Sequence, residues 1–365
     1  MDAPDRLPPP ETDTFSGWPS QPVGVRIRDV GEIAAALPHL LGFRPQESVV
    51  LIGLGGASGR RVGLTVRADI PPPEHNRSLA GVLSRSLSTD KPDGALILVV
   101  SEAADETFAG ERDLPHHDLV WEMCRALSRG ALPVGDIVLV RDGRWWSYDC
   151  PDHCCVPGAG TPLPTGVTEL EVASIATGTV VESAREDLVA RIAGPIGRDR
   201  GAMAAACDRV AVECSAAVLD SGLAEVRAQS WSAIQDAAAR CRPGVGRRLE
   251  DEEVARVVWG LRDGEVRDLA MGLALGDEPA AAEQLWTECT RRAPAPLDAA
   301  PATLLAVCAW LRGDGAMANI ALGRALTSEP GYGLARLLAD ALAACITPSD
   351  LRAMLTEAST APSAG

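Results

Sequence analysis

The sequence predicts an α/β amino-terminal domain with a mixed sheet, followed by an all-α region that ends in tetratricopeptide-like helical hairpins. Two observations support this fold class. Before about residue 166, short apolar runs alternate with amphipathic segments, which is typical of strands interleaved with helices. Beyond it, Ala-rich helical patterns continue almost to the end of the 365-residue chain. The expected division is a flexible lead-in at 1–23, an α/β domain at 24–180, an α-helical region at 181–345, and a terminal helix and tail at 346–365.

Local patterns predict the elements of the α/β domain. Asp29 and Glu32 have the spacing of a capping box and begin a helix that we expect to end before Pro38. Asp142-Gly143 is the strongest hairpin signal, because this pair supplies the positive φ angles of a type I′ turn. Strands are expected at 25–28, 48–53, 61–70, 95–100, 137–141 and 144–148, and helices at 74–88 and 115–129.

The helical region contains two further patterns. An apolar stripe with helical spacing includes Cys207 and Cys214, so we expect both thiols in the core. A weak internal repeat covers about 265–345, and its second copy resembles the tetratricopeptide pattern. In that copy Gly313-Asp314 fits the turn between helices, while Ala318, Leu322, Ala325 and Pro330 occupy the small, large, small and helix-ending positions. Two repeats are fewer than a free-standing solenoid needs, so we expect this unit to pack against the rest.

Charge and hydropathy exclude two classes of partner. The net charge is −16, and the basic residues form only isolated pairs, Arg60-Arg61, Arg247-Arg248 and Arg291-Arg292, each typical of a solvated face. We therefore expect no nucleic acid. Lys91 is the single lysine. The amino terminus is acidic and Pro-rich, unlike a signal peptide, and the apolar runs are too short to cross a membrane, so we expect a cytoplasmic protein with reduced thiols.

The loop 150–155 carries possible metal ligands. Cys150, His153, Cys154 and Cys155 offer soft and borderline donors within six residues, and zinc is the ion to which such a set points. We expect the side chains of adjacent Cys154 and Cys155 to point in different directions, which leaves one incomplete knuckle. A second pair of ligands would have to come from His116, His117 or Cys124. Redox chemistry and a purely structural loop are the alternatives.

The strand before this loop concentrates aromatic residues. Alternation places Arg144, Trp146 and Tyr148 on one face, with Trp145 and Ser147 on the other. We expect Trp145 to enter the core. The face with Arg144, Trp146 and Tyr148 has the chemistry to stack a planar ligand or to anchor a partner. The alternative is that the helical region covers this face.

Several segments together resemble a known family. The stretches 40–50 and 143–148 are similar to signatures of the actinobacterial domain-of-unknown-function family 4192, and 154–155, 160–162 and 310–342 also look similar. The resemblance extends from about Val23 to Ala343. It implies an actinobacterial, cytoplasmic origin, but it brings no activity and no catalytic residue.

The sequence thus favours a non-catalytic binding or scaffolding protein, with an unknown protein or small molecule as its partner. This follows from the helical repeats and from the lack of any complete catalytic constellation in the sequence. The alternative is a metal-binding protein or an enzyme that uses the Cys150–Cys155 loop together with the His116/His117 helix. The sequence leaves open whether the protein is an enzyme.

Overall fold

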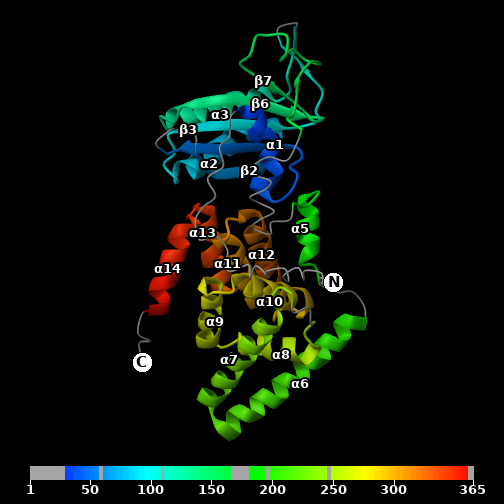
Figure 1. Ribbon diagram of the computed structural model, residues 1–365, viewed down its shortest axis with the longest axis vertical. Helices are drawn as coiled ribbons and strands as arrows, with labels where there is room; N and C mark the ends of the chain where they lie inside the picture. The colour runs from blue at the N-terminus through cyan, green and yellow to red at the C-terminus, as the bar shows by residue number, and fades with distance from the viewer. Residues whose placement is uncertain are drawn as a thin grey trace, which may run out of the picture.

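The structure is a computed structural model that describes residues 29–56, 61–108, 111–165, 181–194, 198–244 and 248–360. A sheet with its helices forms one end of the molecule, and the remaining helices form the other end (Figure 1). The expected lead-in at 1–23 and strand at 25–28 lie outside the described residues, as does the predicted domain boundary at 180. The expected fold class is confirmed, because a mixed sheet is followed by a helix-rich region.

The sheet has six strands in the order β2-β1-β3-β6-β7-β8. Only β3 and β6 run parallel, while the other neighbouring pairs are antiparallel. The helix α3 (His117–Arg129) connects these two parallel strands. The strands span β1 (Ser48–Gly55), β2 (Arg61–Asp69), β3 (Gly94–Val100), β6 (Val134–Arg141), β7 (Arg144–Ser147) and β8 (Thr161–Pro162).

Helices cover both faces of the sheet. The helix α1 (Val30–Leu41) packs Ile33, Ala34 and Leu37 on one face. The helices α2 (Asn76–Ser88) and α3 pack on the other face, where their apolar residues join those of β1, β3 and β6. Consecutive strand residues point to opposite faces, so the apolar runs of β1 and β3 are buried on both sides.

Two local predictions have different outcomes. The capping interaction of α1 is confirmed, since the backbone N–H of Glu32 donates to Asp29 Oδ1 at 2.9 Å. The end predicted before Pro38 is wrong, because α1 continues to Leu41 with Pro38 inside it. The packing of the last turn offsets the backbone hydrogen bond that proline removes. Gly42, with φ of 77°, ends the helix in the left-handed conformation.

The hairpin predicted at Asp142-Gly143 is present. Arg141 pairs with Arg144, and the two residues between them have φ angles of 46° and 68°, as a type I′ turn requires. The sequence did not predict a second, short hairpin formed by β4 (Glu106–Phe108) and β5 (Glu111–Asp113). Its strands are polar and lack apolar alternation, so no periodic signal marked them.

The helical region has one continuous core. Small residues let α11 and α12 approach closely, and Ala302, Ala318, Ala321 and Ala325 are fully buried there. Cys207 is buried as expected, while Cys214 is only partly buried. The similarity of α11 and α12 to a tetratricopeptide unit stays a prediction. The helices span α5 (Arg185–Arg191), α6 (Arg198–Ser221), α7 (Leu223–Arg240), α8 (Asp251–Gly260), α9 (Gly264–Met271), α10 (Pro279–Arg292), α11 (Ala299–Leu311), α12 (Gly315–Ser328), α13 (Gly333–Ala343) and α14 (Pro348–Thr360).

The two ends of the molecule share a junction. Phe43, just after α1, is 3% exposed and belongs to the core of the helical region. It also forms an isolated β-bridge with Glu182, which lies in the segment that leads into α5. At a second contact, Thr89 Oγ1 donates to the carbonyl oxygen of Cys345 at 3.4 Å. Lys91 lies exposed in the same turn, with φ of 50°. The helical core therefore extends into the α/β domain through Phe43.

Candidate functional site

Of the three residues predicted as a ligand face, Trp146 and Tyr148 are covered by the protein's own atoms, whereas Arg144 is exposed. Trp146 is 3% exposed and packs with the core beneath α2 and α3, and Tyr148 packs beside it. Trp145 packs against the α1 side, so the alternation is confirmed and both tryptophans contact core clusters. The segment before α3 and the loop before β8, rather than the helical region, cover Trp146 and Tyr148, and a ligand-binding role for this face stays a prediction.

The polar atoms of this strand are held by backbone carbonyl groups. The hydroxyl of Tyr148 donates to the carbonyl oxygen of Pro115 at 2.7 Å, and burial raises its pKa far above the ordinary value, with Glu106 adding to the shift. The guanidinium of Arg144 donates to the carbonyl oxygens of Ala159 and Gly160, at 2.9 Å each. These bonds connect the strand to the segment before α3 and to the end of the Cys loop.

Gly160 allows that loop to close on Trp146. Its φ is +71°, and a Cβ atom there would lie 2.4 Å from Cζ2 of the Trp146 indole. Both the backbone conformation and the space therefore require glycine. The guanidinium of Arg141 stacks on the indole ring, with its carbon 4.9 Å from the centroid. Trp146 is thus a packing residue between the sheet and the Cys loop.

The loop gathers three of the four predicted metal ligands. The sulfur atoms of Cys150, Cys154 and Cys155 all lie within 4.8 Å of one another. The expectation that Cys154 and Cys155 point apart is wrong, since their sulfurs are 3.7 Å apart. A tight turn, in which the N–H of Cys155 donates to the carbonyl oxygen of Asp152, brings them together. His153 is exposed and is not part of this sulfur cluster.

The second set of ligands is not brought to the loop. In the described part of the chain, none of His116, His117 and Cys124 joins the sulfur cluster. His117 instead pairs with Asp113 at 3.0 Å and contacts the Tyr148 ring edge-on. Burial raises the pKa of the Cys124 thiol, and Asp149 adds to the rise. The loop therefore offers sulfur ligands without imidazole partners from α3.

A polar cluster that the sequence did not reveal lies where β3 ends. Ser101 Oγ is 2.8 Å from Glu47 Oε2 and 2.8 Å from His116 Nε2. Glu47 and His116 both have positive φ angles, 38° and 66°. The hydroxyl of Ser101 donates to the Glu47 carboxylate, and the direction of its hydrogen bond with His116 depends on the tautomer of the imidazole. The cluster fastens two residues that have positive φ angles.

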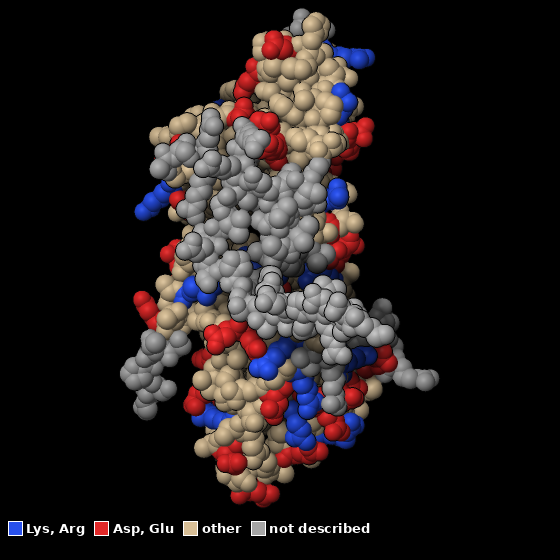
Figure 2. All heavy atoms as spheres, viewed as in Figure 1, with Lys and Arg blue, Asp and Glu red and all other residues tan. Residues whose placement is uncertain are grey.

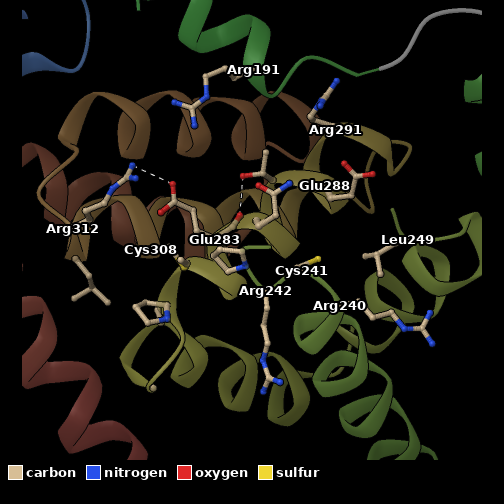
Figure 3. Close-up of a pocket in the computed structure, with 18 of the residues that line it drawn as sticks. Arg191, Arg240, Cys241, Arg242, Leu249, Glu283, Glu288, Arg291, Cys308 and Arg312 are labelled. Carbon is tan, nitrogen blue, oxygen red and sulfur yellow. Dashed lines mark hydrogen bonds and ion pairs between the residues drawn. The ribbon is translucent and has the colours of Figure 1, made fainter. Parts of the chain in front are cut away.

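A larger site lies in the helical region. A cavity of about 1100 Å³ opens between α5, α7, α10, α11 and α14, and Figure 3 shows many of its lining side chains. Arg191 and Arg291 lie on one side of it, while Arg240 and Arg242 lie on the other. Two acidic residues line it, Glu283 and Glu288, against the arginines Arg191, Arg240, Arg242, Arg248, Arg291, Arg292, Arg312 and Arg352.

Some of these arginines hold the helices together. Arg292 is 7% exposed and donates to the carbonyl oxygen of Leu249 at 2.6 Å, to Glu288 at 3.0 Å and to Asp251. The expectation that the Arg291-Arg292 pair forms a solvated face is thus wrong for Arg292. Arg312 pairs with Glu283 at 3.1 Å, an interaction drawn as a dashed line in Figure 3. Removing one partner of such a partly buried ion pair strongly lowers the stability of the fold, so we assign a structural role to Arg292 and Arg312.

Other arginines of the cavity form no ion pair, or only a long one, so their charge is available to a ligand. Arg291 and Arg352 are exposed and form no ion pair with any residue in the described ranges. For Arg191 and Arg248, the nearest ion-pair contacts, to Glu182 and Glu288, are long at 3.9 and 3.8 Å. Across the visible face in Figure 2, basic and acidic side chains of the helical region intermingle. Arg240 and Arg242 pair with Glu253 and Glu278, which do not line the cavity. Among the described residues, the positive charge without an acidic partner at the cavity is therefore that of Arg291 and Arg352.

Burial raises the pKa of three titratable groups that line the cavity. The pKa of Cys241 is raised to about 11 and that of Cys308 is raised further, in both cases mainly by burial. Burial also raises the pKa of Glu283, against the opposing effect of Arg312. Protonated thiols are poor nucleophiles, so the cavity carries recognition chemistry rather than an activated cysteine.

Comparison with known proteins identifies a family. A family model described as Domain of unknown function (DUF4192) matches residues 31–349. No curated protein and no solved structure matches the chain. No helix within the described residues is long and apolar enough to cross a membrane. The actinobacterial origin and the cytoplasmic location stay predictions.

Proposed function

The chain belongs to the DUF4192 family, and from the geometry of its helical region we propose that it is a binding protein for a small multivalent anion. The single observation that supports this is the concentration of arginines around the 1100 Å³ cavity in a protein of net charge −16. The proposal specifies the binding role that the sequence favoured. A protein partner and a scaffolding role stay predictions.

Arginine chemistry defines the ligand class. A guanidinium presents a planar fork of N–H donors that matches phosphate and carboxylate oxygens in pairs. The uncommitted Arg291 and Arg352 supply such forks from α10 and α14. Because the protein as a whole repels anions, affinity must come from this local positive field, which salt screens. The cavity volume of about 1100 Å³ lies just above the usual range for small-molecule sites, about 300–1,000 Å³.

Calorimetric titration with pyrophosphate and with citrate tests the proposal, and glucose serves as a neutral control. We expect saturable binding of at least one anion, weakening as the salt concentration rises, and no binding of glucose. The double variant Arg291→Gln, Arg352→Gln should lose roughly 10-fold in affinity or more for each charge, because a hydrogen bond to a charged group contributes about 1.5–3 kcal/mol. Arg336→Gln on α13, exposed and outside the cavity, is the matched control.

Two results would contradict the proposal. One is the absence of binding by both anions at low salt. The other is undiminished affinity in the double variant, which would place any anion site elsewhere. Comparison of the two anions distinguishes the ligand class, since a site for phosphate groups prefers pyrophosphate and a site for carboxylate groups prefers citrate.

A further inference from the structure

The three clustered thiols of the Cys loop are arranged as metal ligands. Cys150 Sγ and Cys154 Sγ are 3.9 Å apart, and Cys154 Sγ and Cys155 Sγ are 3.7 Å apart. In a tetrahedral zinc site with Zn–S bonds of about 2.3 Å, two sulfur ligands lie about 3.8 Å apart. Two of the three sulfur–sulfur distances therefore match those around one zinc ion, and the third pair, Cys150 and Cys155, lies within 4.8 Å.

The loop holds this arrangement through bonds outside the cluster. The backbone N–H of Ser147 donates to Cys155 Sγ at 3.2 Å, the kind of hydrogen bond that orients a metal-bound thiolate. Arg144 ties the far end of the loop to β7, and Gly160 seats it on Trp146. Cys155 is buried, whereas Cys154 is exposed, so an ion can enter from the solvent side. The cluster is thus anchored by the sheet and open on one side.

The composition of the cluster indicates the class of ion. Thiolates are soft ligands that select zinc or copper(I) over calcium and magnesium. Three protein ligands with solvent access on the fourth side are typical of a zinc site that keeps an open position. His153 is adjacent in sequence, but its imidazole lies outside the cluster. The fourth position is therefore left to a molecule from solution.

We propose that Cys150, Cys154 and Cys155 bind one Zn²⁺ ion as thiolates, with the fourth position open to water or to an exogenous ligand. Each thiol gives its proton to solvent as it ligates, so binding releases up to three protons per ion. No oxidation or reduction is involved. This site lies in the α/β domain and is independent of the arginine-lined cavity.

Titration of the reduced full-length protein with Zn²⁺, in competition with a chromophoric chelator, tests the stoichiometry. Co²⁺ replaces zinc for spectroscopy, because tetrahedral thiolate coordination gives intense visible and near-ultraviolet bands. We expect one ion per chain. Cys154→Ser and Cys150→Ser should each weaken binding roughly 100-fold or more, since loss of a mere outer-shell partner already costs 10–100-fold. Circular dichroism establishes that the metal-free variants remain folded.

Two variants discriminate the ligand set. Cys345→Ser removes a thiol far from the loop and should leave the affinity unchanged, which excludes a general effect of losing one cysteine. His153→Ala should also leave the affinity and the cobalt spectrum unchanged. Equal losses in His153→Ala and Cys154→Ser would overturn the three-sulfur site. Failure to bind one Zn²⁺, or binding of copper(I) alone, would overturn the proposal itself.

Discussion

The α/β domain and the helical region achieve close packing with opposite combinations of side chains. In the α/β domain, large rings face glycines: a Cβ on Gly160 would lie 2.4 Å from Trp146, and one on Gly31 would lie 2.8 Å from Trp145. In the helical region, alanines such as Ala302 and Ala321 are fully buried between helices. The packing of rings against glycines depends on a few positions that tolerate no side chain. The packing of alanines between helices is distributed over many positions.

Cysteine shows the same contrast. In the helical region Cys207, Cys289 and Cys308 are buried among apolar residues, and burial raises the pKa of each thiol. In the α/β domain the sulfurs of the Cys loop lie within 4.8 Å of one another, and the cluster extends from buried Cys155 to exposed Cys154. Thus a thiol in the helical region is a small apolar group, and a thiol in the loop is a candidate ligand. The residue type alone does not distinguish the two roles.

The strongest test of the division between the two regions is Phe43→Ala. Phe43 belongs to the α/β half of the chain but is buried in the helical core. We expect the free energy of unfolding to fall by about 3–5 kcal/mol, as for other buried phenylalanines, in urea titrations followed by circular dichroism. Val82→Ala, at a side chain that is 47% exposed, should change stability by no more than about 0.5 kcal/mol. A loss below about 1 kcal/mol at Phe43 would show that the junction is not part of the core.

Gly160→Ala tests the ring-against-glycine packing of the α/β domain. Left-handed backbone strain costs an alanine about 1–2 kcal/mol, and overpacking against Trp146 adds about 1–3 kcal/mol. Gly158→Ala is the matched control, because its φ is +85° but no atom lies within 4 Å of the added Cβ. Chemical denaturation should therefore show a larger loss for Gly160→Ala. Equal losses would mean that contact with the indole contributes nothing.

Ala321→Leu tests the alanine packing of the helical region. Ala321 lies on α12 with no exposed surface, so the added bulk should cost about 1–3 kcal/mol in thermal or urea unfolding. Gly323→Ala, two residues further along the same helix, meets no atom within 4 Å and should stabilise the protein by about 0.5–1 kcal/mol. Destabilisation by both changes would argue that the helix itself, not its buried face, is sensitive.

Tyr148→Phe produces the smallest expected effect and one that depends on pH. At pH 8 the variant should lose about 0.5–1.5 kcal/mol with the hydrogen bond to Pro115. In the folded wild type, burial keeps Tyr148 protonated well above its ordinary pKa of about 10. Above pH 10 the unfolded chain ionises this phenol, so wild-type stability falls by about 1.4 kcal/mol per pH unit.

The phenylalanine variant lacks that phenol, so the difference in stability between the two proteins should shrink and then reverse as the pH rises through 10 to 11. Unfolding titrations at pH 8, 10 and 11 provide the measurement. The buried cysteines add the same alkaline loss to both proteins and cancel in the difference. A constant difference across this range would mean that Tyr148 ionises normally in the folded state.

Features that depend on neighbouring residues could be predicted from the sequence. The Asp29 cap and the Asp142-Gly143 turn are examples, since each requires only a few consecutive residues. The end of α1 could not be predicted, because packing of the turn after Pro38 outweighs the preference of proline. The polar hairpin of β4 and β5 carried no periodic signal either.

The candidate sites divide in the same way. The Cys loop stood out because its ligands are contiguous, although only the turn at Asp152 reveals that Cys154 and Cys155 face each other. The cavity gave no local signal, because its arginines come from α5, α7, α10, α14 and the segments that follow α7 and α11, between residues 191 and 352. The contact of Ser101 with Glu47 and His116 likewise depends on which strands are neighbours in the sheet.

The solitary lysine, exposed in the turn after α2, has a practical consequence. Apart from a terminal amine, Lys91 is the only group on the chain that an amine-reactive dye will modify. It lies two residues from Thr89, which contacts the helical region through Cys345. The natural sequence thus accepts a single fluorophore on Lys91, beside the junction, without engineered cysteines. The emission of this fluorophore would report on whether the two halves of the molecule separate.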